Sequence, residues 1–226
     1  MAPDAWLRPG MAMVLDMDGV IVDSNPLHVA AWTLYNRRFG IDAGAALAER
    51  MYGRRNDEIV REFFGAHLSA DQIAVHGAAK EDLYRKMLEP GLAETLVPGG
   101  QQFLQRHAGR SVGLATNAEP ANVDFILDRG GLRAYFQVVV DGHQVQHPKP
   151  HPEIYLRAAR LLAVPPRNCI VFEDSFWGVA AAQAAGTRIV GLRTTHPALP
   201  GAHLEIDDFR SPQLAAWLQR QVPDGS

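Results

Sequence analysis

Short apolar runs alternate with helical patterns along most of this chain, and that alternation limits the fold more than any other feature. One such run, residues 13–15, lies near the N-terminus. From residue 97 onward, each further apolar run is followed by a segment whose apolar residues have helical spacing. Strands that alternate with helices of about ten residues or more form βαβ units around a parallel sheet. The sequence therefore predicts a doubly wound, Rossmann-like α/β fold.

The predicted elements divide the chain into two units. Strands are expected at residues 13–15, 111–115, 137–140, 170–172 and 188–192, and helices at 98–107, 120–129, 152–162, 179–185 and 212–221. The stretch in between differs, because residues 23–93 hold amphipathic segments and no convincing strand. We expect an α/β core formed by residues 1–22 and 94–226, with residues 23–93 as an inserted helical cap. An insert at the carboxyl end of a strand would cover the ligand crevice as a lid.

Composition argues against several classes of protein. The 226 residues carry a formal net charge of -3 and no basic run, so a nucleic-acid partner is not expected. Cys169 is the only cysteine, so no intramolecular disulfide is expected, and its apolar neighbours predict a buried position. Neither a signal peptide nor a membrane span is evident in the pattern. We expect a cytoplasmic monomer or weak dimer with no membrane partner.

Polar side chains follow the predicted strands at the points where each strand ends. Asp16 and Asp18 follow the first strand, and Gly19 comes directly after them. Two more pairs end later strands, and a lysine between prolines precedes a helix: Thr116-Asn117, Glu173-Asp174 and Lys149. Taken singly, each group is explained as well by a turn, a helix cap or a solvated loop charge. Together they meet at one edge of one parallel sheet, where such sheets bind ligands.

The set has the chemistry of phosphoryl transfer. Asp16 would be the nucleophile and form an aspartyl phosphate, and Asp18 would serve as general acid and then general base. A carboxylate that attacks an anionic phosphate needs a divalent cation. Lys149 and Thr116 would hold the phosphoryl oxygens. The oxygen ligands suit Mg²⁺, and they would be Asp16, the backbone carbonyl of Asp18, Asp174, and Glu173 through water.

The same residues carry a family resemblance. The order Asp16-Met17-Asp18-Gly19, Thr116-Asn117, Lys149-Pro150 and Glu173-Asp174-Ser175 resembles the haloacid dehalogenase superfamily over essentially the whole chain. The predicted insert is similar to the small helical cap of the β-phosphoglucomutase and phosphoglycolate-phosphatase branch. The true dehalogenases of this superfamily lack the second aspartate, so Asp18 favours phosphate chemistry. The resemblance implies a magnesium-dependent phosphatase acting on a small phosphorylated metabolite, such as a sugar or nucleoside monophosphate.

The substrate is less constrained. His28 and Trp32, one helical turn apart, resemble a pair in β-phosphoglucomutases in which the histidine assists acid/base gating, but packing explains them equally well. Residues 53–58 depart from the phosphate-binding pattern of the mutases, which argues against a mutase. We expect Arg54, Arg55 and Asn117 to contact substrate, although a solvated loop position also explains the two arginines. A mutase-type phosphotransferase and a catalytically weak phospho-ligand-binding protein remain alternatives. The three histidines of one loop, His143, His147 and His151, lack a zinc-type spacing and are interpreted as surface residues.

Overall fold

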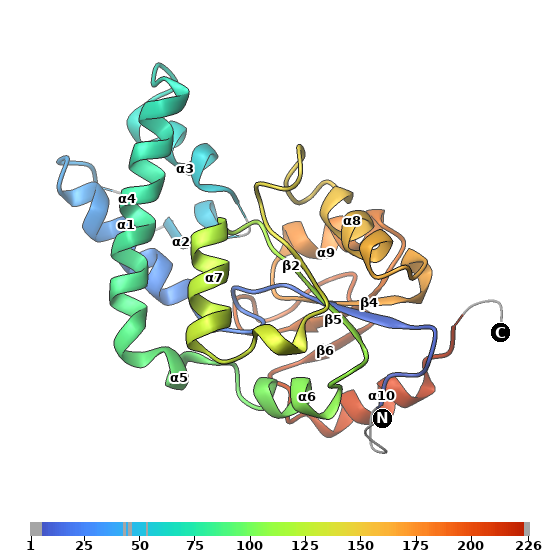
Figure 1. The fold of residues 1–226 in the computed structure, drawn as a ribbon. Helices are drawn as coiled ribbons and strands as arrows, with labels where there is room; N and C mark the ends of the chain where they lie inside the picture. Colours follow the sequence, from blue (N-terminus) through green and yellow to red (C-terminus); the bar gives the residue numbers. More distant parts are fainter. Residues whose placement is uncertain (1–5, 43, 45–46, 53, 224–226) are drawn as a thin grey trace.

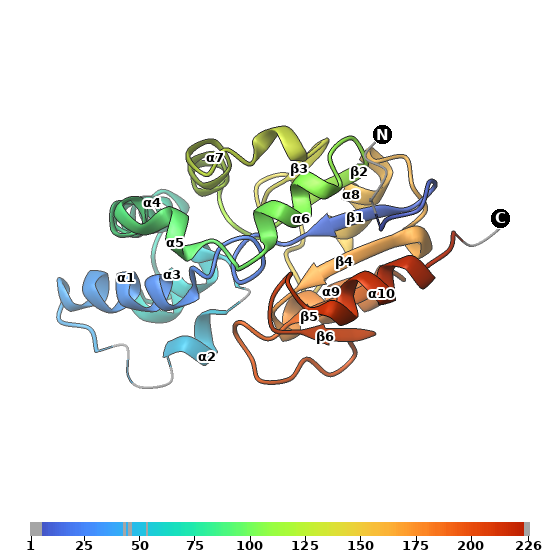
Figure 2. The ribbon, with the colours of Figure 1, turned by 90° about the horizontal axis from the view of Figure 1, so that it is seen from below.

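The computed structural model describes residues 6–42, 44, 47–52 and 54–223. Its centre is a six-stranded parallel sheet in the order β3-β2-β1-β4-β5-β6 (Figures 1 and 2). The strands are β1 (Ala12–Leu15), β2 (Ser111–Ala115), β3 (Val138–Val140), β4 (Cys169–Glu173), β5 (Arg188–Leu192) and β6 (Leu204–Ile206). The expected doubly wound fold is confirmed. The strand β6 was not predicted, because its three residues include only one that is buried and so lack an apolar run.

Helices cover both faces of the sheet, which explains why the central strand β1 is apolar and buried along its whole length. One face packs against α6 (Gly100–Arg106), α7 (Pro120–Arg129) and α10 (Pro212–Arg220), and the other against α8 (Glu153–Leu161) and α9 (Phe176–Ala184). Along β1, Met13 and Leu15 join the first layer while Ala12 and Val14 join the second. Cys169 lies buried in that second layer. The single-turn 3₁₀ helices are η1 (Glu89–Gly91), η2 (Arg133–Tyr135) and η3 (Pro166–Asn168).

The remaining α-helices gather on one side of the sheet, beyond the carboxyl end of β1 (Figure 2). They are α1 (Asn25–Arg37), α2 (Leu47–Met51), α3 (Asn56–Phe64) and α4 (Ala70–Leu88), and the short α5 (Leu92–Thr95) leads back to the core. Trp32, Ile59 and Val60 belong to a hydrophobic cluster of this helical unit that is separate from the two clusters against the sheet. Residues 43, 45, 46 and Gly53 lie outside the described part.

The two passages between this helical unit and the sheet run side by side. The Asp23 amide donates to the Thr95 carbonyl at 2.8 Å, and the Val97 amide donates to the Ile21 carbonyl at 3.0 Å. The two connections therefore lie beside each other, which suits a unit that moves as one body relative to the sheet. In the described part of the chain, no helix is long and apolar enough to cross a membrane.

His107, at the end of α6, is expected to make the stability of the folded chain depend on pH. Its ring is buried, with Nε2 accepting from the Trp6 amide at 3.2 Å and Nδ1 lying 2.8 Å from the Phe103 carbonyl oxygen. Burial lowers the pKa of His107 from 6.5 to about 4. The unfolded chain therefore binds a proton between these values that the folded chain does not, and stability falls as the pH drops below 6.5.

We expect His107 to account for about 2 kcal/mol of the stability that is lost between pH 7 and pH 5. Urea unfolding of the wild type and of His107→Gln at both pH values measures this contribution. The variant should be less stable at pH 7 but should lose about 2 kcal/mol less on acidification. An identical loss in both proteins would show that His107 is not the titrating group.

Candidate active site

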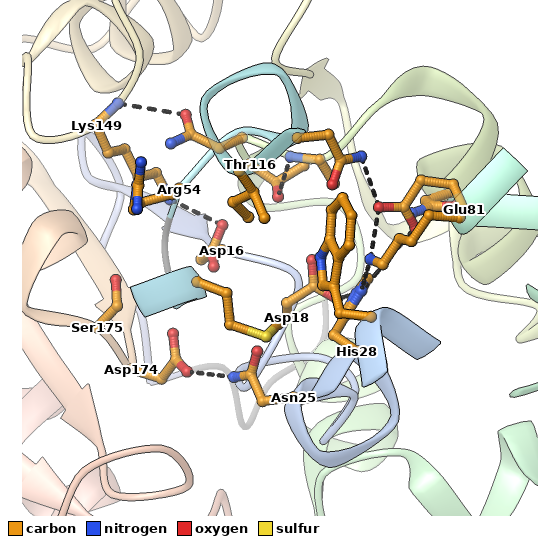
Figure 3. Close-up of a pocket in the computed structure, with 18 residues that line it drawn as sticks. Asp16, Asp18, Asn25, His28, Arg54, Glu81, Thr116, Lys149, Asp174 and Ser175 are labelled. Carbon is orange, nitrogen blue, oxygen red and sulfur yellow. Dashed lines mark hydrogen bonds and ion pairs between the residues drawn. The ribbon is translucent and has the colours of Figure 1, made fainter. Parts of the chain in front are cut away.

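The ends of three adjacent strands bring the predicted residues into one cavity (Figure 3). Asp16 follows β1, Thr116 follows β2, and Asp174 follows β4, and all three side chains are buried. The facing wall comes from α1, α3 and α4 of the helical unit. Because parallel strands end at one edge, residues far apart in sequence meet here.

Lys149 occupies the centre of this arrangement. Its Nζ atom donates to Asp16 Oδ1 at 2.8 Å, to Glu173 Oε1 at 2.7 Å and to the Ala115 carbonyl at 3.1 Å. The ammonium is buried, which works to lower the pKa of Lys149, but the carboxylates of Asp16 and Glu173 raise it above its usual value. The lysine is therefore a fixed positive charge beside Asp16.

The carboxylates of Asp16, Glu173 and Asp174 each offer an oxygen within 4.8 Å of the others. Burial raises the pKa of Asp16 to about 7, with Glu173 adding to the effect and Lys149 opposing it. Burial, followed by the charges of Glu173 and Asp16, raises the pKa of Asp174 well above its usual value. Three carboxylates against one ammonium leave two negative charges uncompensated when all are ionised. A divalent cation with oxygen ligands would balance that charge.

Glu173 was expected to reach a cation through water, but both of its oxygens are already engaged. Oε1 accepts from Lys149 and from the Tyr155 hydroxyl at 2.6 Å, and Oε2 accepts from the amides of Asp174 and Ser175 and from the Ser175 hydroxyl. Burial opposes ionisation, yet these contacts, led by Lys149, lower the pKa of Glu173. Its geometry suits the orientation of Lys149 better than cation ligation.

Asp174 is held by two residues that the sequence analysis did not single out. Asn25, at the start of α1, donates from Nδ2 to Asp174 Oδ2 at 3.0 Å, and Thr195 donates to the same oxygen. These bonds leave the second oxygen of Asp174 for a cation. Gly19 has a φ of +76°, and a Cβ atom there would lie 1.9 Å from Asp174 Oδ2. The glycine after the second aspartate is therefore required for the carboxylate of Asp174 to fit.

Asp18 faces the helical unit. Its Oδ1 atom accepts a short hydrogen bond from the Ser24 hydroxyl and lies 3.4 Å from Nε2 of His28. Burial works to raise the pKa of Asp18, but the contacts with His28 and Ser24 hold it below its usual value. The predicted helix histidine is thus a direct neighbour of the predicted acid/base.

A buried ion pair stands behind His28 and was missed by the sequence analysis. Lys80 Nζ lies 2.7 Å from His28 Nδ1 and 2.8 Å from Glu81 Oε1, and both members of the pair are at most 2% exposed. Burial works to raise the pKa of Glu81, but Lys80, then His28, lower it to about 2. The two carboxylate oxygens also accept from the amides of Asn56 and Asn122. The signal in the sequence was the four-residue spacing of Lys80, Tyr84 and Leu88 along one face of α4.

The structure separates the two predicted substrate arginines. Arg54 lines the cavity, with its guanidinium 2.6 Å from Glu62 Oε2. Arg55 lines a neighbouring groove between the helical unit and the core and lies 3.6 Å from Asp57. Asn117 lines both the cavity and the neighbouring groove. Its Oδ1 atom accepts a hydrogen bond from the Lys149 amide at 3.3 Å.

Three comparisons place this geometry among known proteins. The family model described as haloacid dehalogenase-like hydrolase matches residues 11–186. The fructose-1-phosphate phosphatase YqaB of Escherichia coli is 31% identical over 80% of this chain and 95% of its own length. The β-phosphoglucomutase of Bacillus subtilis is 28% identical over 86% and 88%. The crystal structure of a Clostridium difficile β-phosphoglucomutase superposes with a TM-score of 0.80 at 24% identity, covering 92% of this chain and 96% of that one.

Proposed function

This chain belongs to the haloacid dehalogenase-like hydrolases, and from that membership we propose that it is a magnesium-dependent phosphatase of a small sugar monophosphate. One observation carries the proposal: Lys149 Nζ bonds Asp16 Oδ1 at 2.8 Å beside the Asp174 carboxylate. The sugar class is supported by relatives such as YqaB, whose name specifies fructose 1-phosphate.

Asp16 is the proposed nucleophile. Lys149 holds Oδ1, and the other carboxylate oxygen attacks phosphorus while the bond from phosphorus to the sugar oxygen breaks. Asp18 must first take up a proton, because its contacts with His28 and Ser24 hold its pKa low, and it then donates that proton to the leaving oxygen. It then takes a proton from the water that attacks the aspartyl phosphate, so phosphate leaves and both aspartates return to their starting state. Lys149 and Thr116 hold the phosphoryl oxygens as negative charge moves onto them.

The donor set fits Mg²⁺, with Asp16, Asp174 and the Asp18 backbone carbonyl as the protein ligands. When bound, the cation offsets the negative charge of the phosphate and of the carboxylates around it. Asn25 and Thr195 orient Asp174 for this role, and Glu173 orients Lys149. The proposed cation ligands follow strands of the sheet, whereas Asn25 belongs to the helical unit.

The helical unit is the proposed cap, with residues 23–93 forming it and residues 1–22 and 94–226 forming the core. Its cavity wall combines an apolar part, Trp32, Met51 and Ile59, with the polar side chains Arg54 and Asn56. A sugar offers an apolar ring face together with hydroxyl groups, so this combination suits it. Closure of the cap would exclude water from the first step, and His28 of the cap already contacts Asp18 of the core.

Arg54→Ala should lower kcat/KM for the sugar phosphate by roughly ten- to a hundredfold, the effect of one lost charge-assisted hydrogen bond. The same change should affect a small synthetic phosphate ester much less, because that ester lacks the sugar. Arg55→Ala is the matched control, since Arg55 lines the neighbouring groove and not this cavity. Equal losses on both esters, or an equal effect of Arg55→Ala, would remove Arg54 from sugar recognition.

Phosphate release over a panel of hexose, pentose and nucleoside monophosphates tests the proposed function. We expect release from a few related sugar esters with Mg²⁺ and none after chelation. Release that persists under chelation would contradict the cation requirement.

A β-phosphoglucomutase-type phosphotransferase is the second candidate. It is favoured by the contact of His28 with Asp18 and by the relatives of that name. Conversion of a hexose 1-phosphate to the 6-phosphate with a bisphosphate primer, without phosphate release, would select it. Inactivity in both assays would instead favour a phospho-ligand-binding protein.

A further inference from the structure

The loop between β3 and α8 brings together a second cluster of metal-ligating side chains. His147, His151 and Glu153 each offer a ligand atom within 4.8 Å of the others. His147 Nδ1 lies 2.9 Å from Glu153 Oε2, and His151 Nδ1 lies 4.0 Å from the same oxygen. None of the three lines the catalytic cavity, and both imidazoles are at least half exposed.

The loop backbone fixes the carboxylate of this cluster. Glu153, the first residue of α8, accepts hydrogen bonds from the amides of Gln146 at 2.9 Å and His147 at 3.1 Å. These two bonds hold the carboxylate beside the His147 ring, so one ligand for a cation is in place.

We propose that His147, His151 and Glu153 bind a divalent transition-metal cation of the Zn²⁺ type, separate from the catalytic cation. Two imidazole nitrogens and a carboxylate oxygen are a common ligand set for Zn²⁺, with water in the fourth position. Tetrahedral ligands with Zn²⁺ bonds of usual length lie about 3.4 Å apart. Glu153 Oε2 lies 2.9 Å from His147 Nδ1 and 4.0 Å from His151 Nδ1, on either side of that value. Small side-chain rotations would therefore complete the site.

The histidine nitrogens are compatible with ligation. The Glu153 amide donates to His151 Nδ1 at 3.3 Å, so this nitrogen carries a lone pair. A cation would replace that long hydrogen bond and the contact of His147 Nδ1 with Glu153. Mg²⁺ prefers oxygen ligands, so the cluster and the catalytic carboxylates should take different cations.

A cation bound at this cluster would stabilise the loop that carries Lys149. Lys149 lies midway between the two histidines in sequence, and its ammonium is fixed on Asp16 and Glu173. A cation would tie together both sides of the loop that delivers Lys149 to the catalytic cavity. It binds only the folded arrangement and therefore stabilises it.

Isothermal titration with ZnCl₂ in excess MgCl₂ tests the proposal on the full chain. The wild type should bind one more Zn²⁺ than His147→Asn/His151→Asn, or bind it roughly tenfold or more tightly. His143→Asn is the matched control, because it removes an exposed histidine of the same loop that lies outside the cluster. This control should bind Zn²⁺ as the wild type does.

The melting temperature is a second measurement, and it shows whether the double variant is folded. Without Zn²⁺, its melting temperature should stay close to that of the wild type, whereas Zn²⁺ should raise the melting temperature of the wild type and of His143→Asn only. The single variant His151→Asn should show the same loss if the double variant does not fold. Unchanged Zn²⁺ binding in these variants would overturn the proposal. Because no readout requires turnover, failure here is distinct from failure of the phosphatase proposal.

Discussion

Asp16→Asn is expected to abolish turnover, with a fall in kcat of about 10⁴-fold or more. An amide oxygen cannot form the acyl phosphate, although asparagine has nearly the shape of aspartate and its carbonyl can still accept from Lys149. The fold should therefore persist. Steady-state kinetics with Mg²⁺ and the circular dichroism spectrum of the variant measure the two parts of this expectation.

Asp141→Asn is the matched control for this experiment. Asp141 is also a buried carboxylate at the carboxyl end of a strand, directly after β3. Its oxygens accept from the His143 amide and the Gln144 side chain within its own loop, and it does not line the catalytic cavity. The control should keep most of its activity. Substantial turnover by folded Asp16→Asn would remove Asp16 from its proposed role.

Lys80→Met is expected to lower the free energy of unfolding by about 3–5 kcal/mol. The substitution leaves the Glu81 carboxylate 2% exposed without its ammonium partner, while the apolar stem of the side chain keeps its packing. The two asparagine amides around Glu81 donate hydrogen bonds but supply no full charge. Urea unfolding at pH 7 measures the loss.

A double-mutant cycle separates this explanation from simple loss of packing. Lys80→Met/Glu81→Leu removes both charges, so it should be less destabilised than the sum of the two single variants. Lys86→Met is the matched control, because Lys86 pairs with Asp82 on the exposed side of the same helix. That exposed pair should contribute far less to the stability than the buried one. Additive single effects of Lys80 and Glu81 would contradict a coupled buried pair.

The parallel sheet and the convergence of Asp16, Thr116 and Asp174 were predictable because strand ends are visible in the sequence. A buried parallel strand is an apolar run, and the first polar residue after it marks the edge of the sheet. The strand β6 shows the limit of this argument, since a short, half-buried edge strand leaves no apolar run. Its place in the sheet is decided by pairing with β5, which only the folded chain provides.

The contacts within the site were less predictable than its residue types. The sequence placed Glu173 near the proposed cation site, but it did not indicate that Tyr155 and the neighbouring amides occupy its oxygens. In the sequence alone, the adjacent residues Lys80 and Glu81 resemble ordinary surface charges of an amphipathic helix. Their burial against α1 depends on tertiary packing, which a local pattern does not reveal. Likewise, the sequence could not tell which of Arg54 and Arg55 faces the cavity, since the backbone direction at these two residues decides it.

The stereochemical course of hydrolysis at a chiral phosphorus atom tests the aspartyl-phosphate account most directly. Each in-line displacement inverts the configuration at phosphorus. Attack by Asp16 followed by attack of water amounts to two inversions, so the account predicts net retention. Net inversion would mean that water attacks the substrate in a single step, and it would contradict the role of Asp16 as nucleophile.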